Sequence, residues 1–100
     1  MARAFKGRGK GGGVAAKVEI YTRAWCGYCT SAKALLDAKG VAYTEYDVTM
    51  RAPDKARMLQ RQPSARTLPQ IFIDDVAIGG CDDLHALDRA GQLEAMLATA

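Results

Sequence analysis

The chain has 100 residues, 49% of them hydrophobic, which is enough for one small domain with a single hydrophobic core. No apolar run approaches the roughly 18 residues that a membrane-spanning helix needs, so a membrane-spanning helix is excluded. The net charge of +3 arises in residues 1–17, which carry five basic and no acidic side chains, whereas the other residues carry 9 basic and 11 acidic ones, so no nucleic-acid surface is expected on the folded part.

Residues 1–16 are expected to form a disordered, basic, glycine-rich tail, and residues 17–100 the folded domain. Five of the seven residues from Gly7 to Gly13 are glycine, a composition typical of a flexible coil. The tail has no continuous apolar stretch of the kind found in a secretory signal, so we expect a cytoplasmic protein. Stable disulfides are rare in that compartment, and an odd number of cysteines, three, argues against a disulfide framework.

The first predicted unit is a strand, a helix and a second strand. Residues 17–22 alternate apolar and polar side chains, which indicates a strand. Residues 26–39 have apolar side chains at helical spacing, and Gly40 supplies the usual stop. Residues 41–48 predict the second strand, which should run parallel to the first with a right-handed crossover. The residues expected on the apolar face of the helix are Tyr28, Ala32, Leu35 and Leu36.

The second half of the chain predicts shorter elements. Ala52, Ala56 and Leu59 are expected to form the inward face of a helix. Asp74 and Asp75 split an apolar run and indicate a hairpin turn. The predicted elements are a helix over 52–61, strands over 70–73 and 76–78, a helix starting near Asp82 or Asp83, and a last helical turn after Gly91. This order predicts an α/β domain with a mixed four-stranded sheet flanked by helices.

Cys26 and Cys29 form a C-x-x-C pair between the first strand and the first helix. Backbone N–H groups at a helix N-terminus carry partial positive charge and favour a thiolate at Cys26. Arg23, just upstream, adds positive charge. Cys29 lies one turn further into the helix and should stay a thiol. The pattern therefore predicts one attacking sulfur, Cys26, and one resolving sulfur, Cys29.

A zinc site is the structural alternative for this pair. Cys81 and His85 would complete four ligands on paper, but they lie far beyond the usual spacing of about 12–20 residues. His85 is expected on the surface of a short helix. Cys81 is expected to be a small buried apolar residue rather than a reactive one.

Three motifs together, "CGYC", "TLPQIFI" and "GGCDDL", resemble the glutaredoxins. The resemblance covers roughly residues 17–98 and is strongest to the bacterial glutaredoxin 3 subgroup of dithiol proteins. It implies the thioredoxin fold in its minimal form, in agreement with the element order above. One departure is Gly27, which stands where the family's commonest motif has proline. Another is a longer loop before the "TLPQ" segment.

The resemblance also implies a glutathione site. Pro69 should follow a cis peptide bond and present the backbone of Leu68 to the glutathione main chain. Gly80, Cys81 and Asp82 should bind the γ-glutamyl end at a helix N-terminus. The other residues implied for the tripeptide are Arg23, with Arg61 or Gln62 for the glycyl carboxylate, and Tyr28.

The family activity implied is glutathione-dependent reduction of protein–glutathione mixed disulfides and protein disulfides, of the kind found in ribonucleotide reductase. The protein should be a monomer that needs no metal. Two alternatives stay open. One is a [2Fe–2S] carrier, a dimer in which Cys26 of each subunit and two glutathione thiolates bind the cluster. The other is a redoxin that thioredoxin reductase reduces.

Overall fold

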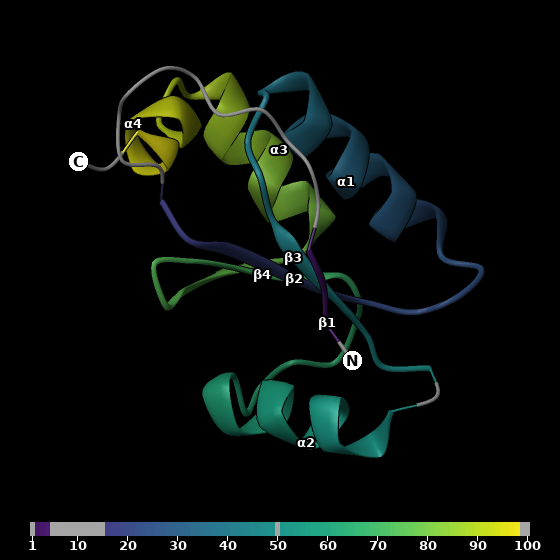
Figure 1. Ribbon diagram of the computed structural model, residues 1–100. Helices are drawn as coiled ribbons and strands as arrows, with labels where there is room; N and C mark the ends of the chain where they lie inside the picture. Colours follow the sequence, from purple (N-terminus) through teal and green to yellow (C-terminus); the bar gives the residue numbers. More distant parts are fainter. Residues whose placement is uncertain (1, 5–15, 50, 99–100) are drawn as a thin grey trace.

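The computed structural model describes residues 2–4, 16–49 and 51–98 (Figure 1). The described strands form one sheet in the order β1-β3-β2-β4-β5. The elements are β1 (Ala2–Ala4), β2 (Val18–Thr22), α1 (Gly27–Ala38), β3 (Thr44–Asp47), α2 (Ala52–Arg61), β4 (Gln70–Ile73), β5 (Val76–Gly79), α3 (Cys81–Arg89) and α4 (Leu93–Leu97).

The predicted four-stranded sheet is confirmed in β3, β2, β4 and β5, to which β1 adds a fifth strand at the edge. β2 and β3 pair in parallel, as the strand–helix–strand unit requires, and β2 pairs with β4 in the antiparallel sense. β4 and β5 form the predicted hairpin, with Asp74 and Asp75 both at positive φ in its turn. The strand expected over 41–48 is shorter, because β3 covers only Thr44–Asp47.

The expectation that residues 1–16 are wholly disordered differs from the structure at both ends of that segment. Ala2–Ala4 form the edge strand β1, antiparallel to β3. Ala16 is buried, and its N–H donates to the carbonyl oxygen of Leu97 at 3.2 Å. An edge strand pairs through backbone groups alone, so a three-residue strand needs no side-chain pattern that a sequence would show. Residues 5–15 lie outside the described residues.

Helices cover both faces of the sheet. Figure 1 shows α1, α3 and α4 together on one face and α2 on the other. Alternate residues of β2 face opposite sides of the sheet. Val18 and Ile20 belong to the apolar cluster under α1, α3 and α4. Tyr21 belongs to the apolar cluster that includes Met58 of α2. Burying each such side chain contributes about 1.5–3 kcal/mol.

The inward face expected for α2 is wrong. Ala52, Ala56 and Leu59 are exposed, and the helix instead buries Asp54 and Met58. One turn separates these two residues, so they share a face. The Arg51 side chain donates to the Asp54 carboxylate at 2.9 Å, which makes burial of this charge tolerable.

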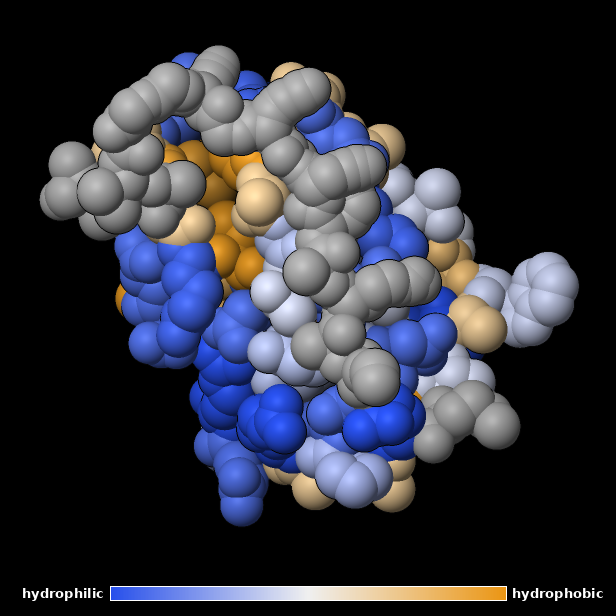
Figure 2. Space-filling view, in the orientation of Figure 1, coloured by the Kyte–Doolittle hydropathy of each residue, from blue (hydrophilic) through white to orange (hydrophobic). Residues whose placement is uncertain are grey.

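The side of α2 that the space-filling view shows is mostly hydrophilic, with some apolar residues among the polar ones (Figure 2). Its buried residues are Asp54 and Met58, so the helix meets the sheet through few apolar side chains. Its last residue, Arg61, leads into the loop that reaches Leu68 and Pro69, so the seating of α2 positions that loop.

Candidate active site

The two cysteines of the C-x-x-C pair lie at the start of α1. The helix begins at Gly27, one residue later than expected, and Cys26 is its N-cap with extended backbone. The backbone N–H of Cys29 donates to the Cys26 sulfur at 3.2 Å. The Cys26 carbonyl oxygen accepts from the N–H of Thr30 at 3.2 Å. An N-cap side chain in this position accepts an otherwise unpaired N–H of the first helical turn, so the sulfur lies at the positive end of the α1 dipole.

The two sulfurs have different surroundings. Cys26 is partly exposed, whereas Cys29 has only 2% of its surface exposed. Burial, with a hydrogen bond to Cys26, raises the pKa of Cys29 to about 12. Cys29 is therefore held as a thiol in the reduced protein, in agreement with the prediction.

Leu68, followed by Pro69, is 42 residues after Cys26 in the sequence but lies beside its thiol in the fold. The Cys26 sulfur lies 3.8 Å from the Leu68 carbonyl oxygen. The Leu68–Pro69 bond is cis, as the resemblance implied. Trp25, directly before the pair, has positive φ and a side chain that is 98% exposed. The reactive sulfur thus lies beside the Leu68 carbonyl, and the residue before it presents an exposed aromatic ring to solvent.

A groove of about 580 Å³ runs from Tyr28 past the Leu68–Pro69 segment to the start of α3. Its size suits a small peptide ligand. Seven of the predicted site residues line it, namely Tyr28, Gln62, Leu68, Pro69, Gly80, Cys81 and Asp82. The groove therefore gathers segments that lie more than 50 residues apart in sequence.

The end of the groove at α3 is built around Gly79 and Asp83. The Asp83 carboxylate accepts from the Gly80 N–H at 3.0 Å. Gly79 has φ +113°, and a Cβ there would collide with the Asp83 side chain. Asp82 is exposed, and its carboxylate has no hydrogen bond or ion pair with the described residues. This carboxylate is available to a cationic ligand group.

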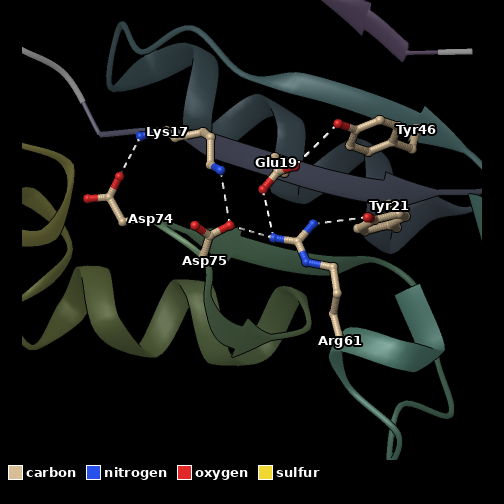
Figure 3. Close-up of polar contacts among 7 residues, drawn as sticks. All are labelled: Lys17, Glu19, Tyr21, Tyr46, Arg61, Asp74 and Asp75. Atoms are coloured by element: carbon tan, nitrogen blue, oxygen red, sulfur yellow. Dashed lines mark hydrogen bonds and ion pairs between the residues drawn. The ribbon is translucent and has the colours of Figure 1, made fainter. Parts of the chain in front are cut away.

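Arg61 does not line the groove, contrary to the prediction. Its guanidinium donates to Glu19 at 2.8 Å, to the Tyr21 hydroxyl at 3.0 Å and to Asp75 at 3.1 Å (Figure 3). It also stacks 4.0 Å above the Phe72 ring. The hydrogen bond with Glu19 is the main cause that raises the Arg61 pKa. These partners turn the side chain toward the sheet and away from the groove.

Arg66 and Thr67 line the groove but were not predicted. Both also line a neighbouring hollow of about 990 Å³, which Arg23 and Trp25 border. The predicted Arg23 therefore lies beside the groove rather than in it. The available signal was position, since Arg66 and Thr67 directly precede Leu68 in the chain.

The zinc alternative gains no geometric support. His85 bonds to Ser31 at 3.2 Å, and Cys81 is buried as expected, with 7% of its surface exposed. Within the described residues, no three His, Cys, Asp or Glu side chains are arranged to hold a metal ion.

The same part of the chain contains no helix long and apolar enough to cross a membrane.

Comparison with known proteins gives consistent matches. The glutaredoxin family model matches residues 18–78. Glutaredoxin 3 of Escherichia coli strain K12 is 50% identical over 82 residues, 82% of this chain and 98% of that protein. The solution structure of a Brucella melitensis glutaredoxin has a TM-score of 0.75 at 46% identity, covering 89% of this chain and 96% of that one. The chain belongs to the glutaredoxin family.

A buckwheat glutaredoxin–glutathione complex is a further structural match. Its TM-score is 0.74 at 32% identity, covering 85% of this chain and 83% of that one. This chain has the thioredoxin fold that the resemblance implied. It is a glutathione-dependent thiol–disulfide oxidoreductase, and its Cys26–Cys29 pair fits a C-x-x-C motif.

Proposed function

We propose that Cys26 is the attacking cysteine and Cys29 the resolving one. The observation that carries this assignment is the 3.2 Å hydrogen bond from the Cys29 N–H to the Cys26 sulfur, at the N-terminus of α1. That bond stabilises charge on Cys26. Burial raises the pKa of Cys29, which therefore stays a thiol until the resolving step. These are the roles that the sequence predicts for the two residues.

Removal of glutathione from a protein needs Cys26 alone. The Cys26 thiolate attacks the glutathione sulfur of the mixed disulfide, and the protein leaves as a thiolate that takes a proton from solvent. A second glutathione thiolate then attacks the glutathione sulfur bonded to Cys26. Glutathione disulfide leaves, and the Cys26 thiolate is regenerated.

Reduction of a protein disulfide uses both cysteines. The Cys26 thiolate attacks one sulfur of the substrate disulfide and forms a mixed disulfide with it, and the other substrate sulfur leaves as a thiolate that takes a proton from solvent. Cys29 loses its proton and attacks the Cys26 sulfur, which closes the Cys26–Cys29 disulfide and releases the reduced protein. Two glutathione molecules then reduce that disulfide.

The groove is the proposed glutathione site. The exposed Asp82 carboxylate binds the ammonium of the γ-glutamyl end, and the backbone of Leu68 pairs with the peptide main chain. Arg66 joins Gln62 and Arg23 as a partner for the glycyl carboxylate, in place of Arg61. The buckwheat complex supports glutathione as ligand, since that protein is a structural match over most of this chain.

The test separates the two cysteines by substrate. Cys26→Ser should abolish both reactions, whereas Cys29→Ser should keep removal of glutathione from a glutathionylated peptide within about threefold and lose protein-disulfide reduction. Turnover is measured with glutathione and glutathione reductase, and with thioredoxin reductase as the alternative electron donor. If Cys29→Ser is as inactive as Cys26→Ser toward the glutathionylated peptide, the assignment is wrong.

A [2Fe–2S] carrier is the second candidate function. Cys26 is the described cysteine that is not buried, so one chain offers one thiolate, and a four-thiolate cluster would need two chains and two glutathiones. A Cβ at Gly27 would meet nothing within 4 Å, so Gly27→Pro is a suitable variant. Anaerobic addition of iron, sulfide and glutathione should give a coloured dimer. A colourless monomer that behaves like Gly27→Pro would exclude this function.

A further inference from the structure

A second hollow lies against Cys29, apart from the glutathione groove. Its volume is about 610 Å³, and both cysteines of the C-x-x-C pair border it. The remaining residues that line it are Arg23, Ala24, Trp25, Gly27, Thr30, Lys33, Glu45 and Asp47. Cys29 thus faces an ion pair that takes no part in the proposed reaction so far.

Lys33 and Glu45 form this ion pair. The Lys33 Nζ lies 3.0 Å from a Glu45 carboxylate oxygen, and the Thr22 hydroxyl donates to the same oxygen at 2.7 Å. The two side chains are 31% and 17% exposed, so the pair is largely shielded from solvent. Lys33 is four residues after Cys29 in α1 and therefore lies on the same helix face.

The charge of Lys33 acts on Cys29 in the direction that favours ionisation. Burial and the neighbouring Cys26 raise the Cys29 pKa, whereas Lys33 and a backbone hydrogen bond at Arg23 lower it. Once Cys26 is joined to a substrate in a mixed disulfide, it carries no charge. Burial then opposes ionisation of Cys29, and Lys33 is the side chain that counters it.

We propose that Lys33, held in place by Glu45, is a positioning residue that stabilises the Cys29 thiolate and so sets the rate of the resolving step. This inference rests on the proposed roles of Cys26 and Cys29. In that step the Cys29 thiol gives its proton to solvent through the hollow. The thiolate attacks the Cys26 sulfur, the Cys26–Cys29 bond forms, and the substrate sulfur leaves and is protonated by solvent. Lys33 keeps its proton throughout.

The other charged groups around the hollow define how Lys33 acts. Arg23 is the second cation, and Glu45 and Asp47 of β3 are the anions that oppose a thiolate. Lys33 neutralises Glu45 as well as attracting the thiolate. Removing Lys33 alone should therefore slow the step more than removing Lys33 and Glu45 together.

The experiment measures closure of the Cys26–Cys29 disulfide in protein preloaded with glutathione on Cys26. Closure is followed by acid quench and mass spectrometry from pH 6 to pH 10. Lys33→Gln should slow closure at pH 7 about two- to fivefold. The fall in the fraction of Cys29 present as thiolate outweighs the greater nucleophilicity of each thiolate. Its pH profile should move to higher pH, since the Cys29 pKa rises further and the same thiolate fraction needs more base.

Matched variants separate charge from packing. Lys33→Arg should retain the wild-type rate and profile, and the double variant Lys33→Gln with Glu45→Gln should recover part of the loss. Lys39→Gln is the control, because Lys39 is an ion-paired lysine at the other end of the α1 region, bonded to Asp88 and Glu94. It should leave closure unchanged.

The readout also separates this inference from the proposed function. Removal of glutathione from a peptide does not use Cys29, so Lys33→Gln should leave it unchanged. Equal slowing of both reactions, or an unshifted closure profile, would overturn the role of Lys33. Protein-disulfide reduction that persists in Cys29→Ser would instead overturn the proposed function itself.

Discussion

Chemically identical residues in this protein differ through their nearest neighbours. Cys26 accepts a backbone N–H at the start of α1, whereas Cys29, one helical turn further on, has 2% of its surface exposed. Arg61 and Arg66 show the same contrast. Arg61 is bound by two carboxylates and a hydroxyl, whereas Arg66 is exposed, without a hydrogen bond or ion pair to the described residues. Reactivity and ligand binding at this site therefore depend on which side chains are left without partners.

Charge reversal in and beside the groove should weaken glutathione binding rather than chemistry. Asp82→Lys, Arg66→Glu and Arg23→Glu should each raise the Michaelis constant for glutathione about three- to tenfold, since each removes a charge-assisted contact at the surface. The limiting rate should change less, because these groups lie away from the reacting sulfurs. Steady-state kinetics with a glutathionylated peptide give both values.

Asp37→Lys is the matched control for these variants. Asp37 is an exposed carboxylate on α1 that does not line the groove. Unchanged Michaelis constants in all three variants would show that glutathione binds neither in the groove nor beside it. A change in Arg66→Glu without one in Arg23→Glu would assign the glycyl carboxylate to the groove alone.

The sequence predicts best the positions of residues that belong to short contiguous motifs. The C-x-x-C pair lies at the start of α1, and the Leu68–Pro69 segment and the start of α3 line one groove, as these motifs indicate. Arg61 was misplaced because the direction of a long side chain at a helix end depends on partners from distant strands, here Glu19 and Asp75. No local pattern records such partners.

At the scale of elements, α2 is fixed to the sheet largely by Met58 and Arg61. Met58 belongs to the apolar cluster on this face, and the Arg61 guanidinium spans Glu19 of β2 and Asp75 of the hairpin turn (Figure 3). Lys17 joins the same network through Asp75 at 3.0 Å. The network therefore connects α2, β2 and the β4–β5 turn. The residues that follow α2 and those that end β5 line the groove.

Arg61→Met should destabilise the fold by about 1–3 kcal/mol, because it leaves the nearly buried Glu19 carboxylate without its main partner. Methionine keeps an unbranched stem over the Phe72 ring, so lost packing is small. Urea unfolding of the reduced protein measures the change. Adding Glu19→Gln should recover much of the loss, since the uncompensated charge disappears.

Lys55→Met on the same helix is the control, since Lys55 is exposed and has no ion pair with the described residues. It should change stability by less than about 0.5 kcal/mol. Equal stability of the Arg61→Met and Lys55→Met proteins would mean that the Arg61 network contributes nothing.

Periodicity predicted which elements exist better than it predicted which faces they bury. The strands at Val18–Thr22 and Gln70–Ile73 agree with the expected ranges closely, and α2 has the expected bounds. The predicted inward face of α2 was wrong because aspartate is normally an exposed residue. The arginine that pairs with the buried Asp54 is seen only in the structure. β1 was missed because edge pairing uses only backbone groups.

For the molecule as a whole, the continuous part of the described fold begins at Ala16, one residue before the expected start at residue 17, and β1 adds an edge strand to it. Ala16 is buried against α4, and its N–H donates to Leu97. Lys17 is tied to the hairpin turn by its N–H to Asp74 at 2.8 Å and its Nζ to Asp75 at 3.0 Å. Residues 16 and 17 thus join the N-terminal segment to α4 and to the β4–β5 hairpin.

Two truncations test this boundary. Removing residues 2–15, with Met1 joined to Ala16, should cost less than about 1 kcal/mol, because the lost strand β1 has three residues at a sheet edge. Removing residues 2–17 should cost about 1–2 kcal/mol more, since the Ala16 and Lys17 hydrogen bonds are lost as well. Both proteins should turn over a small disulfide at the wild-type rate, as the site lies on other elements. Thermal unfolding supplies the comparison, and a large loss already in the shorter truncation would place the boundary before Ala16.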